Sequence, residues 1–224
     1  MSRAEGSGGG EPTPYDNVPD ELQKRDQWLL WDSSADTPRQ PHWNGDHTIS
    51  WSNPDDWHTF EETVRLARTR ETWGIGYVTA ADNGDYPAGK YAVIDIDGGV
   101  DDYGNLKEWV PDLDMFTKAA TYIEWSPSGT GIHIPVDATK APEWWSDSQI
   151  GEHEGVDLLS NKFCTFTGDK LQESGSAIAQ VNPTPWLFDA YTELRGESPR
   201  LEGESNDEYD GGEWLEDSHV ENAL

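Results

Sequence analysis

Two aspartates interrupt an otherwise apolar segment, YAVIDIDGG, at residues 91–99. Alternate residues of a β-strand point to the same face, so Asp95 and Asp97 should project together while apolar neighbours pack around them. Two parallel carboxylates repel unless a cation lies between them, and a hard divalent ion such as Mg²⁺ prefers oxygen ligands and accepts phosphate in its remaining positions. The pair therefore indicates a metal site. For this segment alone, the alternative is a turn of acidic residues at a strand end, helped by Gly98 and Gly99.

A second motif, SPSGTGIHI, occupies residues 126–134 and places a tight turn before a strand. Its hydroxyls and backbone amides could receive phosphate oxygens, and a nearby imidazole could donate a hydrogen bond to a polyphosphate. His133 should point away from Ile132 and Ile134, toward the polar side of the strand. The alternative is a simple hairpin with a half-buried histidine. The candidate phosphate-binding residues are Ser126, Ser128, Gly129, Gly131 and His133.

A third motif, EGVDLLSNKFCTFTG, covers residues 154–168. Asp157 lies in an apolar strand and would add the carboxylate that completes a divalent site. Lys162 precedes the next strand, and a lysine in a chain with only 15 basic residues favours a phosphate contact. Each residue alone could be an ordinary surface residue. On successive strands the three motifs form a specific constellation.

The overall charge is strongly acidic, with 44 acidic against 15 basic residues and a net charge of −29 over 224 residues. From Glu197 onward there are 10 acidic residues and 1 basic residue, so a net charge of −20 remains on the first 196 residues. The excess therefore also covers the folded part, which is typical of a halophilic protein whose surface charges are screened by molar salt. An acidic decoy or chaperone-like surface is the alternative.

No run of about 18 apolar residues and no signal-peptide pattern is present, so we expect a cytoplasmic protein with no membrane partner. The single cysteine, Cys164, cannot form an internal disulfide and is expected to be a small buried hydrophobe. Residues 1–14 are rich in Gly, Ser and Pro and predict a disordered segment. Residues 196–224 predict an acidic tail or linker, which leaves one catalytic body at 15–195.

Strands and helices are mixed within this body, which predicts an α/β (α+β) fold. A short helix should follow Pro19, and a second helix, capped by Asn53 and starting with Pro54, should run through residues 53–70. The final helix is expected at residues 185–194. The expected strands lie at residues 27–31, 73–79 and 90–97, in a pair around the glycine turn at 121–126 and 131–137, and in another pair at 155–160 and 162–168.

At these motifs the chain resembles the archaeo-eukaryotic primase superfamily. More specifically, it is similar to the bifunctional DNA primase/polymerase amino-terminal domain of phage, plasmid and archaeal mobile-element replication proteins, of a haloarchaeal kind. The similarity extends from about Val18 to about Leu171 and includes VPDELQKRDQWLLWD, SNPDDWHTFEETV, WGIGYVT, TYIEWSPSGTGIHI and FCTFTGD. It implies a small amino-terminal α/β lobe against a mixed-sheet lobe similar to an RNA-recognition motif, with the site between them.

The resemblance also implies an activity, which is template-dependent nucleotidyl transfer by a DNA primase/polymerase. Two divalent ions, Mg²⁺ or Mn²⁺, would be held by Asp95, Asp97 and Asp157, and His133 would contact the triphosphate beside the serine and glycine turn. Lys162 stands where relatives often carry an arginine and would contact a phosphate. The implied partners are a single-stranded DNA template, nucleoside triphosphates and a replicative helicase acting in trans.

Other classes of function remain open at this point. A metal-dependent nuclease could use the same three aspartates, and a non-catalytic replication accessory could keep the fold for binding nucleic acid. Because cations are scarce, template binding should depend on base stacking and a few arginines. The candidate side chains are Trp43, Trp51, Trp125, Trp144, Trp145, Arg39, Arg65, Arg68 and Arg70. His153 is expected in a solvated loop, without a second histidine at ligand spacing.

Overall fold

The computed structural model describes residues 14–34, 40–79, 90–139, 155–172, 174–178 and 182–195. Nearly all of the predicted disordered segment 1–14 and the predicted acidic tail 196–224 lie outside the described residues. The same holds for the candidate binding residues Arg39, Trp144 and Trp145, and for His153. The boundaries of the predicted catalytic body at 15–195 remain a prediction.

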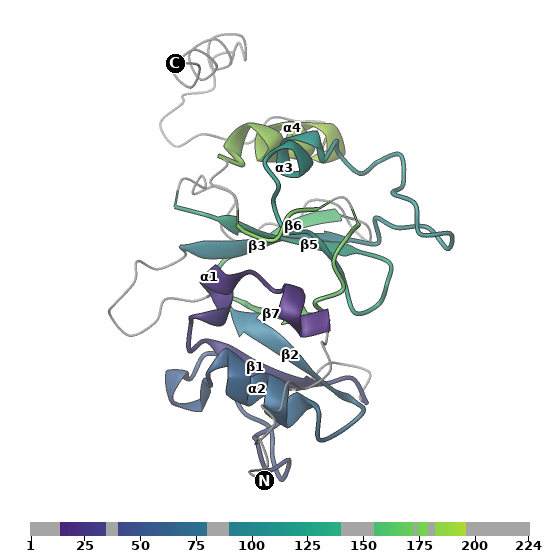
Figure 1. The fold of residues 1–224 in the computed structure, drawn as a ribbon. Helices are drawn as coiled ribbons and strands as arrows, with labels where there is room; N and C mark the ends of the chain where they lie inside the picture. Colours follow the sequence, from purple (N-terminus) through teal and green to yellow (C-terminus); the bar gives the residue numbers. More distant parts are fainter. Residues whose placement is uncertain are drawn as a thin grey trace, which may run out of the picture.

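Two antiparallel sheets form the centre of the structure, which confirms the mixed α+β class (Figure 1). The three-stranded sheet has the order β1-β2-β7. Its strands are β1 (Trp28–Asp32), β2 (Trp73–Val78) and β7 (Phe163–Phe166). The four-stranded sheet has the order β4-β5-β3-β6. Its strands are β3 (Tyr91–Asp97), β4 (Glu124–Trp125), β5 (Ile132–Asp137) and β6 (Gly155–Leu159).

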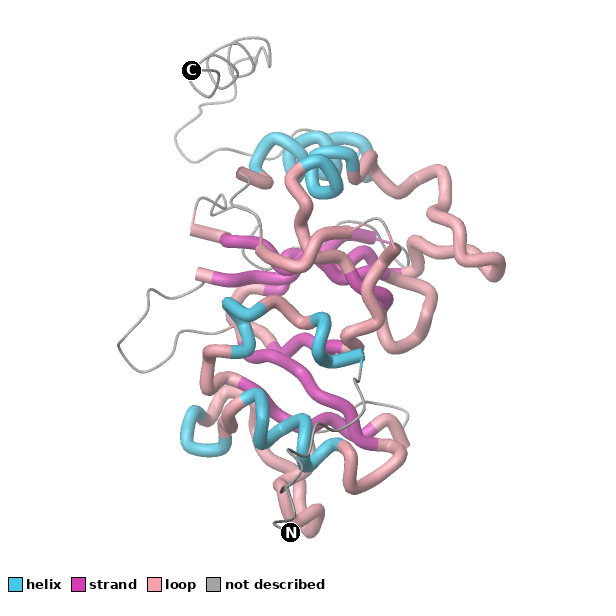
Figure 2. Tube along the Cα trace, in the orientation of Figure 1, coloured by secondary structure: helices cyan, strands magenta, loops and turns pink. Residues whose placement is uncertain are grey.

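Helices cover the two outer sides of this pair of sheets (Figures 1 and 2). The first of them, α2 (Phe60–Ala67), packs on β1 and β2, whereas α3 (Asp114–Lys118) and α4 (Thr184–Arg195) cover the four-stranded sheet. The remaining short helices are η1 (Pro14–Asn17), α1 (Asp20–Gln23) and η2 (Pro54–Asp56). None of the helices described here combines the length and apolar character needed to cross a membrane.

The helix predicted at residues 53–70 is interrupted, so that prediction is wrong in its middle. Asn53 caps only the short η2, where its side chain accepts a hydrogen bond from the Asp55 backbone N–H. Trp57 then adopts an extended backbone with ψ of 148°, and its indole N–H donates to the Trp51 carbonyl at 2.8 Å. Helix α2 starts afterwards with its own cap, the Thr59 hydroxyl, which accepts from the Glu62 N–H at 3.2 Å.

The last two predicted strands, β6 and β7, do not pair with each other, contrary to expectation. Strand β6 pairs with β3, and β7 pairs with β2, so the chain crosses from one sheet to the other between Leu159 and Phe163. Each strand pairs with an apolar strand of a different sheet. The short connection between β6 and β7 is equally compatible with a hairpin, so it did not predict these partners. The crossing brings β7 and the segment after it beside β4, where the Trp125 N–H donates to the Asp169 carbonyl at 2.9 Å.

Strand β3 separates two hydrophobic cores, because its side chains alternate between the two faces of the sheet. Ala92, Ile94 and Ile96 join the core under α3 and α4. Val93 joins the other core, which contains residues of β1, β2, β7 and α2. Asp95 and Asp97 have the parity of Val93 and therefore face the three-stranded sheet.

Candidate active site

Four polar side chains lie in one row across the four-stranded sheet. The strand register sets Glu124 opposite His133, His133 opposite Asp95, and Asp95 opposite Asp157. Directly opposed residues of antiparallel strands project to the same face with short spacing between their side chains. The structure therefore brings together Asp95, His133 and Asp157, which the sequence placed on separate strands, with Asp95 at the centre.

Asp97 extends this row toward solvent at the end of β3. It lies on the same face as Asp95 and is exposed, and its partner on β6 is Gly155, which has no side chain. Asp95 is only partly accessible, with 25% of its side chain exposed. The carboxylates thus run from a half-buried position at Asp95 to an open one at Asp97.

The electrostatic environment of these acids opposes their ionisation. Burial, reinforced by the charges of Asp95 and Asp97, raises the pKa of Asp157 to about 6, against a smaller opposite effect of Lys162. Burial also raises the pKa of Asp95, where His133 lowers it and Asp97 adds to the rise. One buried oxygen of Asp157, Oδ1, has no hydrogen-bond partner among the described residues. A buried, unpartnered oxygen within a group of mutually repelling carboxylates fits a hard divalent cation.

The three aspartates share a face but do not form a compact ligand cluster. Within the described residues, the only group of three or more His, Cys, Asp or Glu side chains that offers one ligand atom each, all within 4.8 Å of one another, is His42, Asp46 and His47. Asp97 is a diagonal neighbour of Asp157 across the β3–β6 pair, and diagonal positions are more widely spaced than opposed ones.

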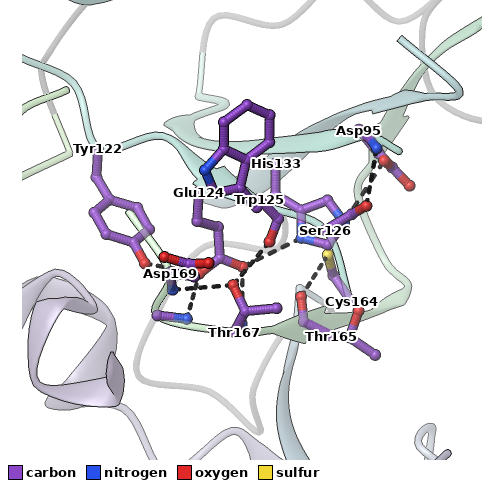
Figure 3. Close-up of polar contacts among 12 residues, drawn as sticks. Asp95, Tyr122, Glu124, Trp125, Ser126, His133, Cys164, Thr165, Thr167 and Asp169 are labelled. Carbon is purple, nitrogen blue, oxygen red and sulfur yellow. Dashed lines mark hydrogen bonds and ion pairs between the residues drawn. The ribbon is translucent and has the colours of Figure 1, made fainter. Parts of the chain in front are cut away.

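Glu124 completes the row and was missed by the sequence analysis. Its side chain is fully buried, and both oxygens accept hydrogen bonds (Figure 3). The donors to Oε2 are the Tyr122 hydroxyl at 2.7 Å and the Gly168 N–H at 2.8 Å, and the donors to Oε1 are the Thr167 N–H at 3.1 Å and His133 Nδ1 at 3.2 Å. The available signal was a glutamate in the apolar segment TYIEW, because a buried charge requires several partners.

His133 is held between two carboxylates and is 4% exposed. Because an ionised carboxylate only accepts, the contact with Glu124 requires a proton on Nδ1, and Nε2 lies 3.6 Å from Asp95 Oδ1. Burial alone lowers the pKa of His133, but Cys164, Glu124 and Asp95 raise it, and the result is well above its usual range. Burial raises the pKa of Cys164, and the carboxylates of Glu124 and Asp95 on either side of the ring favour the imidazolium form of His133.

The turn from Ser126 to Gly131 keeps most of its backbone N–H groups for itself. The Gly129 N–H donates to the Ser126 carbonyl at 2.9 Å, and the Gly131 N–H donates to the Ser126 hydroxyl at 3.1 Å. The Thr130 N–H donates to the Ser128 hydroxyl at 3.2 Å. Three hydroxyls form a chain at the surface, with 3.0 Å from Ser126 to Ser128 and 2.8 Å from Ser128 to Thr130. Hydroxyls rather than amides are therefore the groups this turn can offer to a phosphate.

This turn is fixed against the end of β3, close to the acidic row, the name used here for Asp95, Asp97 and Asp157. The Val100 N–H donates to the Thr130 carbonyl at 2.9 Å. A Cβ atom added to Gly131 would lie 2.7 Å from the Ile96 carbonyl oxygen and 3.4 Å from Asp97 Cα. Gly131 therefore permits a close approach between the turn and the strand that carries both aspartates.

The remaining predicted phosphate and template residues lie in different environments. Lys162 is exposed immediately before β7, close enough to Asp157 to lower the pKa of Asp157. Trp43 is 53% exposed, whereas Trp51 and Trp125 are partly buried and Trp125 packs against the core under α3 and α4. Of the helix-end arginines, Arg70 lies over the Trp73 ring at 4.4 Å.

No protein-family description matches the chain. A curated protein does: the DNA Primase-polymerase of Nitratiruptor phage NrS-1 is 24% identical to the chain over 151 residues. The chain is similar to a phage DNA primase-polymerase. The matched region covers 66% of this chain but only 20% of the phage protein, so the chain spans about a fifth of the length of that relative. This similarity supports the broad relationship expected from the motifs.

Proposed function

We propose that this chain catalyses template-dependent nucleotidyl transfer as a DNA primase or DNA polymerase in replication. One observation carries the proposal: Asp95 lies directly opposite both His133 and Asp157 at the centre of the four-stranded sheet. Three residues from distant segments thus combine acidic ligands for divalent ions with an imidazole that could contact phosphate oxygens, and both would serve the attack of a hydroxyl on the α-phosphate of a nucleoside triphosphate. The similarity to a phage DNA primase-polymerase supports the same reaction class.

In this proposal Asp95, Asp97 and Asp157 hold two divalent ions, Mg²⁺ or Mn²⁺. Bound there, such ions would favour the alkoxide of an attacking 3′-hydroxyl and neutralise charge on the leaving pyrophosphate. The partly buried Asp95 and Asp157 and the exposed Asp97 provide oxygen ligands from the interior to the surface of the site. This arrangement would leave the outer side accessible to a nucleotide.

The imidazolium of His133 would contact the triphosphate of the incoming nucleotide. It is held in one orientation by Glu124, so Nε2 is directed toward Asp95 and the place where phosphate oxygens would lie. The hydroxyls of Ser126 and Ser128 and the exposed Lys162 would add further phosphate contacts, and Gly129 and Gly131 shape the turn.

Single-stranded DNA and nucleoside triphosphates are the expected partners. The net charge of −29 disfavours template binding through phosphate contacts alone, so base stacking on exposed aromatic side chains such as Trp43 should contribute. A replicative helicase acting in trans is also part of the proposal.

Primer extension by the tag-free chain tests this function. The assay contains a primed single-stranded template, labelled nucleotides and Mg²⁺ or Mn²⁺ in molar potassium chloride, and a parallel reaction without primer tests initiation. We expect incorporation by the wild type and none by Asp95→Asn. The matched control is Asp189→Asn, which changes an exposed aspartate on α4. This helix covers the face of the four-stranded sheet opposite to Asp95. A folded Asp95→Asn variant that extends primers at the wild-type rate would refute the proposal.

The same samples separate the proposal from its two alternatives. A metal-dependent nuclease would shorten labelled single strands without nucleoside triphosphates, and Asp95→Asn would abolish that cleavage. A non-catalytic accessory would bind single-stranded DNA equally well in the wild type and in Asp95→Asn, with no synthesis by either. Product length on a sequencing gel therefore decides among the three.

A further inference from the structure

The segment from Gln40 to Ile49 forms a hairpin away from the acidic row, between β1 and η2. The Ile49 N–H donates to the Gln40 carbonyl at 2.9 Å, and Pro41 and Thr48 form a β-bridge. The His42 N–H donates to the His47 carbonyl at 2.9 Å, so these two histidines face each other across a four-residue loop. A cross-strand pair of this type places both side chains on the same face.

The side chains at the end of this hairpin converge. The rings of His42 and His47 are stacked with centroids 4.5 Å apart, and Asp46 contacts His47 Nδ1. One ligand atom from each of His42, Asp46 and His47 lies within 4.8 Å of the other two. Two imidazoles and one carboxylate are therefore gathered by backbone hydrogen bonds of the hairpin, within reach of a single ion.

Asn44 supports this group from the loop. Its Oδ1 lies 2.7 Å from His42 Nδ1, and its Nδ2 donates to Asp46 Oδ2 at 2.9 Å. A side-chain oxygen that accepts from Nδ1 fixes the tautomer and leaves Nε2 of His42 able to bind a metal. Asn44 thus orients two of the three potential ligands in the way that outer residues orient ligands at metal sites.

We propose that His42, Asp46 and His47 bind one divalent transition-metal ion, with Zn²⁺ as its representative. Imidazole nitrogens with a carboxylate suit Zn²⁺, Ni²⁺ or Cu²⁺, whereas the all-carboxylate set at Asp95, Asp97 and Asp157 suits Mg²⁺ or Mn²⁺. Three protein ligands leave one position of a tetrahedral ion for water. The hairpin site therefore selects a different metal from the acidic row and does not depend on the proposed polymerase activity.

A bound ion would fix the hairpin on the lobe that contains the three-stranded sheet. Gly45, inside the loop, packs against the Arg70 guanidinium, which a Cβ atom at this position would approach to 2.6 Å. Arg70 in turn lies over the ring of Trp73, the first residue of β2. The loop between the ligands thus contacts the sheet through one arginine, and cross-linking His42, Asp46 and His47 would stabilise that contact.

Zn²⁺ titration of the tag-free, full chain tests the site, with a chromophoric chelator as competitor and excess Mg²⁺ to occupy the acidic row. We expect one tightly bound Zn²⁺ per wild-type chain, and affinity weaker by about tenfold or more in His42→Gln and His47→Gln. The matched control is His58→Gln, another histidine beside a carboxylate, with Nδ1 3.4 Å from Glu62. It should bind Zn²⁺ as the wild type does. Wild-type affinity in both His42→Gln and His47→Gln would overturn the proposal.

Two further measurements keep the result decisive. The Asp157→Asn variant should bind Zn²⁺ with wild-type affinity, and loss of Zn²⁺ binding there would assign the ion to the acidic row and refute the hairpin site. Electron paramagnetic resonance of Cu²⁺ bound to the wild type should show coupling to two imidazole nitrogens. A spectrum with oxygen ligands only would also refute the site, without dependence on the folding of any variant.

Discussion

Glu124 and His133 form a buried pair in which the Glu124 carboxylate, 3.2 Å from Nδ1, orients the imidazole toward Asp95. Glu124 has no exposed surface, and its other donors are two backbone N–H groups and the Tyr122 hydroxyl. The backbone donors lie immediately after β7, in the segment that passes beside β4. Glu124 therefore connects His133, on the four-stranded sheet, to the end of β7, the edge strand of the three-stranded sheet.

The Glu124→Gln substitution should weaken nucleotide binding more than it slows the chemical step. The amide has only one acceptor oxygen for four donors and carries no charge, so the pKa of His133 should fall and its contact with a triphosphate should weaken. We expect the KM for the nucleotide to rise by about tenfold. The loss of activity at high pH, where His133 loses its proton, should begin at a lower pH than in the wild type. Steady-state incorporation between pH 6 and pH 9 measures both effects.

The control for this substitution is Glu193→Gln, which changes an exposed glutamate on α4. Glu124→Gln should also lower the free energy of unfolding, by about 1–3 kcal/mol, because a buried donor loses its partner. A purely structural role would reduce stability while KM and the pH profile stayed at their Glu193→Gln values. That pattern would contradict a positioning role for Glu124.

Removing the charge of Asp157 should stabilise the protein at neutral pH. The pKa of Asp157 is about 6 in the folded state and about 4 in the unfolded state, so between these two pH values only the folded state keeps the proton. Stability from this group is therefore present at low pH and lost as the pH rises through that window. We expect Asp157→Asn to gain about 1 kcal/mol at pH 7.5, discounted for partial solvent exposure, and almost nothing at pH 4.

Urea unfolding of the wild type and Asp157→Asn at both pH values measures this gain, with Asp189→Asn as the control. A stability difference that is equal at pH 4 and pH 7.5 would show that the substitution acts through packing or hydrogen bonding. That result would contradict the prediction that Asp157→Asn stabilises the protein by removing charge repulsion among Asp95, Asp97 and Asp157.

Mg²⁺ should stabilise the wild type because it relieves the same repulsion. An ion that binds only the folded state raises stability by mass action, by about 2.7 kcal/mol when its concentration is a hundred times Kd. We expect the Tm of the wild type to rise with Mg²⁺ at constant ionic strength, and the Tm of Asp95→Asn to rise much less. Equal shifts in the two proteins, measured against a potassium chloride control, would place Mg²⁺ binding outside the acidic row.

The sequence alone predicted that Asp95 and Asp97 share one face of a strand. It did not predict which side chains of the neighbouring strands lie beside them. The alternation of Asp95 and Asp97 with apolar neighbours follows from the period of two in a strand, and His133 follows the same rule within β5. That Asp157 lies opposite Asp95 depends on strand register, which is set by pairing between distant segments. Glu124 was missed for the same reason, because three of its four donors lie on β5 or immediately after β7.

The incorrect predictions have a common physical origin in tertiary packing. A continuous helix at 53–70 was consistent with its capping residues and amphipathic pattern, but the indole hydrogen bond of Trp57 holds an extended residue between η2 and α2. A β6–β7 hairpin was consistent with the short connection, but each strand pairs in a different sheet. Local sequence indicates that such elements exist, and their partners depend on the complete fold.

The two glycines of the turn beside Asp97 should respond differently to alanine. Gly129 has a φ of +72° and no atom within 4 Å of an added Cβ, so Gly129→Ala should cost only the left-handed backbone strain, about 1 kcal/mol. Gly131→Ala would place a methyl group 2.7 Å from the Ile96 carbonyl oxygen and force the turn away from β3. We expect it to cost about 1–3 kcal/mol and to abolish most incorporation, whereas Gly129→Ala retains activity.

Urea unfolding and primer extension, performed on both variants, separate the position of the turn from its flexibility. If activity depends on the approach of the turn to Asp97, Gly131→Ala loses activity under conditions in which the domain remains folded, and Gly129→Ala serves as its matched control. Equal activity losses in the two variants would show that backbone freedom in the turn matters, rather than the close contact with β3. Full activity in a folded Gly131→Ala variant would remove this turn from the proposed site.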